Sequence, residues 1–264
     1  MLTVVKNECK ILLLSVKYNL MKEMTNRVTF LTNVFFMMLN NASFIIQWLI
    51  LYSLKEDIGG YAMKDVMLLW GLSAGTYGLG HIFFEKAYSL SELIMNGKLD
   101  SFLVQPKNVL LSVISSGTNT SAIGDLIYAY VILLIFNFNV KSFLLFTYFI
   151  LLGALILTAF AVLTGSISFW IIRGDMLADN LNGIIINFST YPDGIFKGIV
   201  RLILYTIIPV GMAIYLPLKV ILRFHPLYLL GTTVFTASII LLAFWVFYRG
   251  LRRYTSSNLM SARI

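Results

Sequence analysis

The sequence predicts an all-α polytopic membrane protein, with six transmembrane helices in a single domain over residues 1–264. Hydrophobic residues make up 59% of the chain and charged residues only 12%, about half the share that is usual in a soluble domain. The apolar residues also gather in long, nearly uncharged runs, each near the ~20 residues that a helix needs to cross a bilayer. Six such runs leave no room for a separate soluble domain.

The six expected spans are separated by short polar segments. By residue number they are 28–53, 66–84, 115–136, 143–172, 199–216 and 228–248. The fifth span should kink near Pro209, because proline has no backbone N–H for the helix, and 217–226 is interpreted as a broken outer element. Segment 173–198 contains both charges and an apolar run, so we expect a cytosolic connection that partly re-enters the membrane.

The pattern of apolar and charged side chains in residues 1–27 predicts an amphipathic interfacial helix. Apolar residues recur at helical spacings from Val5 to Leu20, while four lysines occupy the other faces. The helix is too charged to span a membrane. We expect it to lie on the inner leaflet, with its lysines at anionic headgroups.

The distribution of basic residues predicts the orientation. If both termini are cytosolic, fifteen of the 20 lysines and arginines fall in inner segments and five fall in outer loops. Basic residues concentrate on the cytosolic side of membrane proteins. The net charge of +8 therefore indicates membrane orientation and gives no support to nucleic-acid binding.

Polar residues inside the spans are the candidates for a substrate path. Asn33, Asn40 and Gln47 are seven residues apart in the first span, and Asp125 lies within the third. Amides facing lipid would lack partners, so this stripe should face other helices or a water-accessible path. An intramembrane carboxylate suggests function, but it could equally pair with a neighbouring helix or lie at the wet inner end.

The second span contains a small-xxx-small pair, Gly71 and Gly75, which predicts close packing against another helix. Its inner end carries His81, for which a hydrogen-bonded structural role is the simplest expectation.

No motif in the chain indicates catalysis or nucleotide hydrolysis. The phosphate loop GxxxxGK[ST] and the HExxH and GxSxG motifs are missing, and no Cys/His cluster suggests a metal. We therefore predict no catalytic residues, no metal site and no cofactor bound by this chain. One function that the residues leave open is an ion-coupled secondary transporter or channel that uses Asp125. An intramembrane enzyme is disfavoured because His81, Asp125 and Cys9 do not converge at one depth.

The polar segment 85–112, between the second and third spans, is interpreted either as a contact surface for a soluble partner or as an ordinary connecting loop. It contains a short helical pattern ended by Asn96–Gly97, and then a second pattern stopped by Pro106. The sequence Gly97-Lys98-Leu99-Asp100-Ser101-Phe102-Leu103-Val104-Gln105-Pro106 is similar to the G-x-L-D-x-x-L-x-x-P motif of ABC-2-type permeases. Ser189-Thr190-Tyr191-Pro192, Ile208-Pro209 and Tyr215-Leu216-Pro217 also resemble that family, although Gln105 stands where a basic residue is common.

The resemblance covers essentially the whole chain and implies an ABC-2-type permease (type V exporter) architecture. It implies that the chain is the membrane subunit of an exporter for an amphipathic or hydrophobic substrate, such as a peptide antibiotic, drug or lipid-like molecule. The implied partners are cytosolic ABC ATPase subunits, which bind ATP and Mg, a second permease of the same or a related chain, and membrane lipids. The implied location is a bacterial plasma membrane.

The resemblance also implies that region 85–112 seats in a groove of the ATPase. Gly97 would permit the turn, Leu99 and Phe102 would be buried in the groove, and Lys98 and Asp100 would pair by charge. Carried over by position, the coupling residues are Leu93, Gly97, Lys98, Leu99, Asp100, Phe102 and Pro106.

Overall fold

The computed structural model describes residues 2–255, apart from the side chains of residues 2–6 and 9. Arg263, one of the fifteen basic residues expected on the inner side, lies outside the described residues. Regular structure in this range is helical, as predicted. The longer helices are α1 (Leu2–Glu23), α2 (Arg27–Leu54), α3 (Met63–Tyr88), α7 (Ala122–Phe136), α8 (Val140–Ser166), α9 (Gly174–Ser189) and α12 (Pro226–Leu251). The shorter ones are α4 (Leu90–Met95), α5 (Asp100–Leu103), α6 (Val109–Ile114), η1 (Ile167–Phe169), η2 (Asp193–Ile195), α10 (Gly198–Thr206), η3 (Gly211–Tyr215) and α11 (Leu216–Leu222).

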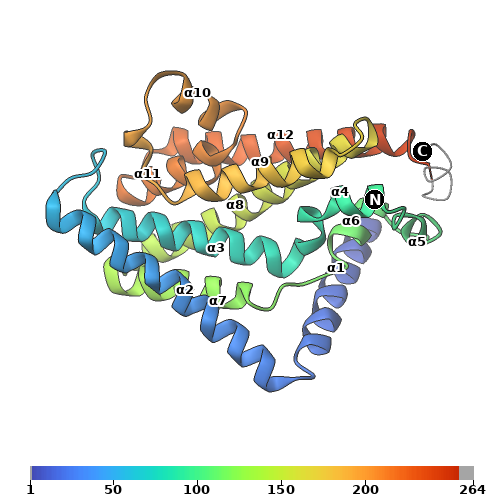
Figure 1. Ribbon diagram of the computed structural model, residues 1–264, viewed down its shortest axis with the longest axis horizontal. Helices are drawn as coiled ribbons and strands as arrows, with labels where there is room; N and C mark the ends of the chain where they lie inside the picture. The colour runs from blue at the N-terminus through green and yellow to red at the C-terminus, as the bar shows by residue number, and fades with distance from the viewer. Residues whose placement is uncertain (1, 256–264) are drawn as a thin grey trace.

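Helix α3 is the centre of the bundle and packs against α7 and α8 (Figure 1). The predicted close packing is confirmed at Gly75, and Gly78 belongs to the same small-residue surface. A Cβ atom on Gly75 would lie 2.5 Å from Cδ1 of Ile150 in α8, and one on Gly78 would lie 2.8 Å from the carbonyl oxygen of Ala122. Glycine at these positions lets the helix backbones approach closely, which increases dispersion contact.

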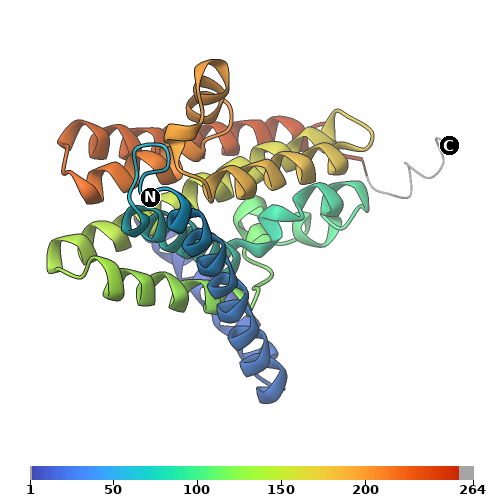
Figure 2. The same cartoon turned by 60° about the vertical axis from the view of Figure 1, so that its left-hand side comes forward.

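Helices α1 and α2 form a wedge beside this bundle (Figures 1 and 2). Helix α1 is bound to the rest of the chain through Ser15 and Asn19, which donate hydrogen bonds of 2.8 and 3.1 Å to the carbonyl oxygen of Ser115. Helix α2 packs mainly on α7, and most of its apolar surface is exposed. A helix with this much exposed apolar surface needs lipid or another subunit around it.

Four helical runs within residues 2–255 are long and apolar enough to cross a membrane: 27–54, 63–95, 140–169 and 226–251. Helix α7 is a shorter apolar helix, because the predicted span 115–136 becomes helical only at Ala122. The polar residues before it bond locally instead. Asn119 Oδ1 accepts from both the backbone N–H and the hydroxyl of Ser121, and this arrangement competes with helix formation.

The predicted fifth span, 199–216, with its kink near Pro209, is a sharply bent pair of helices. Helix α10 ends at Thr206, and the chain resumes at Gly211 as η3 and α11, bent by 78° from α10. The break includes Pro209, where the kink was expected. Asp193 lies five residues before α10 and bonds to Lys219 near the end of α11, so the chain returns to the end of the bundle from which it started.

Segment 173–198, predicted as a connection that partly re-enters the membrane, is packed into the bundle. Most of it is α9, a 16-residue helix that packs along α8 and α3 (Figure 1). Its first turns contact α4 and η1, whereas Ser189 at its end bonds to Ser73 inside α3. Helix α9 therefore runs lengthwise through the bundle, from the end that holds α4 toward the end that holds α10.

Candidate functional site

A cavity of about 470 Å³ lies between α2, α3, α7 and α9. Its wall includes aromatic and polar side chains from helices distant in sequence, among them Phe44, Trp70, Tyr77 and Tyr191. Phe44 stacks on Trp70 with ring centroids 4.5 Å apart. The buried indole N–H of Trp70 has no hydrogen-bond partner among the described residues. A mainly apolar cavity with a few polar groups suits an amphipathic ligand.

Asp125 lies at this cavity, in the first turn of α7, and is buried with 8% of its surface exposed. Asn41 of α2 is also buried, and its Nδ2 donates a 2.5 Å hydrogen bond to Asp125 Oδ1. The same amide group donates to the carbonyl oxygen of Met37. The structure therefore gives Asp125 the helix-pairing role that was one of the two expectations, and it joins α2 to α7.

The three residues of the predicted polar stripe in the first span lie in different surroundings. Asn40 lines the cavity, but Gln47 is exposed and lies outside it, and Asn33 is exposed near the turn between α1 and α2. The interhelical hydrogen bond expected of the stripe comes from Asn41 instead. The seven-residue spacing does not indicate this residue, because it selects the helix face with Asn40, and Asn41 lies about 100° around the helix.

His81 is held by its neighbours on α3. Its Nδ1 lies 2.6 Å from Glu85 Oε2, and its ring stacks on Tyr88 with centroids 4.0 Å apart. Its carbonyl oxygen accepts from the N–H of Asn119, which ties α3 to the loop before α7. These contacts agree with the expected structural role.

Region 85–112 forms a compact projection of α4, α5 and α6 at one end of the bundle (Figure 1). Gly97 ends α4 with φ +68°, a conformation that suits glycine and reverses the chain. Lys98 Nζ lies 3.1 Å from Glu92 Oε1, and both side chains are more than half exposed. The short patterns read from the sequence are therefore real helical turns.

The side chains expected to enter a partner are arranged differently. Leu99 is fully buried inside this chain, and Phe102 and Leu93 pack against the same core. Leu99 therefore cannot fill a groove of the ATPase while the projection stays folded. The exposed apolar residues are Leu103 and Val104, with 41% and 84% of their surface accessible, followed by the exposed Pro106. Sequence spacing could not tell the anchored side of so short a helix from its free side.

The chain beyond α12 also reaches this projection. Burial raises the pKa of Tyr254, and the nearby Asp100 carboxylate raises that pKa further. The Tyr254 ring also packs edge-on against Phe169, with centroids 6.2 Å apart. Asp100 is therefore engaged within the chain, at the point where α5 meets the segment after α12.

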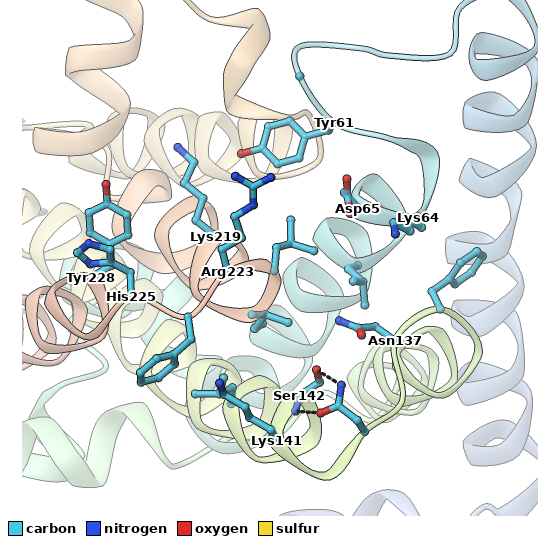
Figure 3. Close-up of a pocket in the computed structure, with 18 residues that line it drawn as sticks. Tyr61, Lys64, Asp65, Asn137, Lys141, Ser142, Lys219, Arg223, His225 and Tyr228 are labelled. Carbon is cyan, nitrogen blue, oxygen red and sulfur yellow. Dashed lines mark hydrogen bonds between the residues drawn. The ribbon is translucent and has the colours of Figure 1, made fainter.

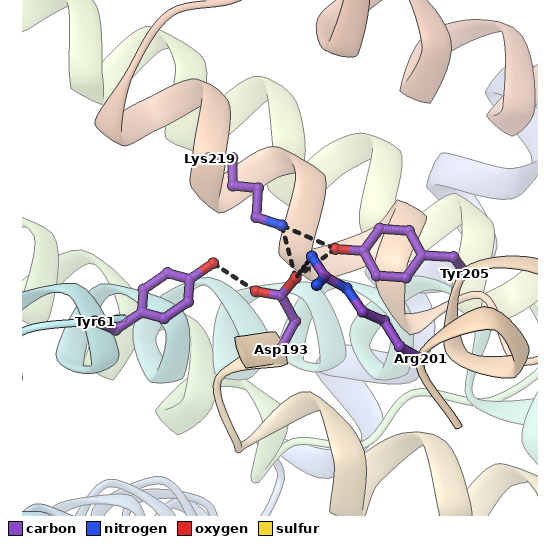
Figure 4. Close-up of polar contacts among 5 residues, drawn as sticks. All are labelled: Tyr61, Asp193, Arg201, Tyr205 and Lys219. Carbon is purple, nitrogen blue, oxygen red and sulfur yellow. Dashed lines mark hydrogen bonds and ion pairs between the residues drawn. The ribbon is translucent and has the colours of Figure 1, made fainter. Parts of the chain in front are cut away.

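The opposite end of the bundle carries a second buried carboxylate, Asp193 in η2 (Figure 4). Its oxygens accept from the hydroxyls of Tyr61 and Tyr205 at 2.5 and 2.7 Å, and from Lys219 Nζ at 2.6 Å and Arg201 at 3.2 Å. Burial alone would raise the pKa of Asp193, but the hydrogen bonds from Lys219, Tyr61 and Tyr205 outweigh it and lower the pKa below its ordinary value. We call these five residues the Asp193 cluster.

The loop that supplies Tyr61 is packed directly on η2. A Cβ atom on Gly59 would lie 2.9 Å from the backbone nitrogen of Ile195, and Gly59 has φ +66°. The two backbones are thus in contact where only glycine fits. Loop 55–62 and the start of the α10–α11 element therefore form one packed unit.

These features define a multi-pass membrane protein with a cavity between its helices and a polar projection at one end. A family model described as ABC-2 family transporter protein matches residues 37–258. The chain belongs to this family, and is thus a permease of an ABC transporter, a family that works with an ABC ATPase. No match was found among curated proteins or among solved structures.

Proposed function

We propose that the chain is the membrane subunit of an ATP-driven exporter of an amphipathic or hydrophobic substrate, such as a peptide antibiotic, drug or lipid-like molecule. A separate cytosolic ATPase, which binds ATP and Mg, supplies the energy, and the location is a bacterial plasma membrane. The observation that carries the proposal is the projection α4–α6. It is anchored in the main hydrophobic core of the chain yet presents two exposed apolar side chains, Leu103 and Val104.

The proposal places this projection in the cytosol and the α10–α11 element on the outside. Six spans then follow, with α9 in place of the predicted span 199–216 and with α10–α11 re-entering from the outer face. Lys197 and Arg201 move to the outer side, because Arg201 bonds to Asp193 there. The basic residues then divide thirteen inside to seven outside, so the charge bias still supports cytosolic termini.

The cavity between α2, α3, α7 and α9 is proposed as part of the substrate path, with Asn40 and Asp125 in its wall. Its aromatic lining can bind a range of apolar groups, and its few amides supply hydrogen bonds. The exposed face of α2 is available to a second permease, of the same or a related chain, which would complete the path. ATP-driven closure of the ATPases would move the two permeases as rigid bodies.

The test compares ATPase recovery by the tagged chain from its native membrane, in mild detergent. The amount of ATPase recovered with the double variant Leu103→Ser/Val104→Ser should be lower than with the wild type, by a factor of about ten or more. Burying one such side chain is worth ~1.5–3 kcal/mol, and tenfold in affinity is about 1.4 kcal/mol.

Leu54→Ser is the matched control, because Leu54 is 80% exposed at the end of α2 away from the projection. ATPase recovery should be unchanged in this variant. Equal losses in the two variants, or a wild-type chain that brings no nucleotide-hydrolysing partner, would contradict the proposal.

A further inference from the structure

A second and larger cavity, of about 870 Å³, opens at the end of the bundle that holds α10 and α11 (Figure 3). Four cationic side chains from separate elements line it. Lys64 belongs to the first turn of α3, Lys141 to the first turn of α8 and Lys219 to α11, while Arg223 follows α11. We call this the basic cavity. Its size is within the range of small-ligand sites.

The positive charge of the basic cavity is not balanced from within the chain. Lys219 is paired with Asp193, and the one acidic residue in the lining, Asp65, accepts from the N–H of Ala62 at the start of α3. In the described part of the chain, Lys64, Lys141 and Arg223 form no ion pair. Like charges gathered around one cavity repel, and an anion at its centre relieves that repulsion.

The remaining lining supplies further hydrogen-bond donors and an apolar side. Tyr228 and His225 both line the cavity, and their rings stack with centroids 4.6 Å apart. Phe224 lies under Lys141 Nζ, 4.5 Å from its ring centroid, and is half exposed. The neighbouring Leu227 is also exposed. An anionic group in the cavity could therefore extend an attached hydrocarbon chain along Phe224 and Leu227, toward the lipid.

We propose that the basic cavity is a binding site for a phosphate-type anion, of the kind that a lipid headgroup or free phosphate presents. Lys64, Lys141 and Arg223 supply the charge, and the apolar flank at Phe224 favours a headgroup that carries a hydrocarbon chain. Arginine binds phosphate oxygens with two parallel N–H groups, and lysine adds a point charge. This site is separate from the mid-bundle cavity, and the inference does not depend on the direction of transport.

The experiment measures binding to the purified transporter complex by native mass spectrometry, with phosphatidylglycerol, phosphatidylcholine and inorganic phosphate as probes. The wild type should bind phosphatidylglycerol at least about tenfold more tightly than phosphatidylcholine. The double variant Lys141→Gln/Arg223→Gln should lose that preference, because two of the three unpaired cations are gone. Lys219 is left unchanged, since it also holds Asp193.

The matched control is Lys55→Gln, which removes one exposed cation of loop 55–62 that does not line the basic cavity. This control should bind phosphatidylglycerol like the wild type. An unchanged elution volume in size-exclusion chromatography will show that each variant is folded. Inorganic phosphate that binds as tightly as phosphatidylglycerol would identify the free anion as the ligand, and weaker binding would identify the lipid headgroup. Equal losses in the double variant and Lys55→Gln, or no loss in the double variant, would overturn the proposal.

Discussion

Asp125 and Asp193, the two buried carboxylates among the described residues, are satisfied in different ways. Asp193 accepts from two tyrosine hydroxyls and is paired with a lysine and an arginine, whereas Asp125 accepts from the single amide of Asn41. A buried charge is stable only when it is paired and hydrogen-bonded. The Asp193 cluster is therefore built for rigidity, while the surroundings of Asp125 leave room for a ligand in the adjoining cavity.

The largest effect should follow from Asp193→Ala, because it leaves Lys219, Arg201 and two tyrosine hydroxyls without their common partner. We expect a loss of about 3 kcal/mol in the free energy of unfolding, the low end for breaking a buried ion pair. The low end applies because Lys219 and Arg201 keep part of their contact with water. Thermal unfolding of the purified protein in detergent measures the loss. Glu56→Gln, an exposed acidic residue of the neighbouring loop, is the control and should change nothing.

The way in which protein stability depends on pH gives a second test of the Asp193 cluster. The pKa of Asp193 is lowered in the folded protein, so its contribution to stability is complete above the unfolded pKa of about 4. That contribution is lost as the pH falls through the lower, folded value. The difference in unfolding midpoint between wild type and Asp193→Asn should therefore stay constant from about pH 5 to 8 and shrink below about pH 4. A difference in unfolding midpoint that grows toward low pH would contradict a lowered pKa of Asp193 in the folded protein.

A smaller effect is expected for Asn41→Leu, which removes the one side-chain donor to Asp125. An unsatisfied buried acceptor costs about 1–3 kcal/mol, and thermal unfolding should show this loss. Asn40→Leu is the control on the neighbouring, exposed position, and it should leave stability near that of the wild type. If Asn40→Leu is the more destabilising of the two, the assignment of the α2–α7 bond to Asn41 is wrong.

The smallest effect on stability should come from Asp125→Asn, because the amide can still accept from Asn41. We expect a change below about 1 kcal/mol, with ATP-dependent transport retained in membrane vesicles. An ion-coupled carrier would instead lose transport in this variant and would depend on a proton or sodium gradient. Transport in the presence of an uncoupler, with and without ATP, distinguishes the two.

Sequence patterning predicted the helical class, the α3 packing surface and the turn at Gly97, since each depends on local composition and spacing. It was less specific for the two segments after α8. Asp175 and Asp179 gave segment 173–198 the pattern of a connection with partial re-entry, and hydropathy did not reveal how closely α9 packs along α8. Pro209 predicted a kink in 199–216, but the size of the bend, 78°, depends on tertiary contacts.

The candidate site was predictable in position but not in detail. The region of α4–α6 and the involvement of Asp125 followed from the sequence. The inward side of Leu99 and the choice of Asn41 over Asn40 depend on helix rotation and tertiary contacts, which a single sequence does not specify. The Asp193 cluster (Figure 4) was missed for a related reason. Lys219 meets Asp193 because the chain bends between α10 and α11, and Tyr61 joins them from the loop between α2 and α3.

The contact of Gly59 with η2 has a practical consequence for reporter design. Loop 55–62 is short, hydrophilic and placed between two long helices, which would make it an obvious place for an epitope tag or a cysteine label. Its backbone, however, touches Ile195, and its Tyr61 is held by Asp193. An insertion there would pull apart two segments more than 130 positions away in sequence. A tag in this loop would therefore report on a damaged end of the bundle instead of on the native topology.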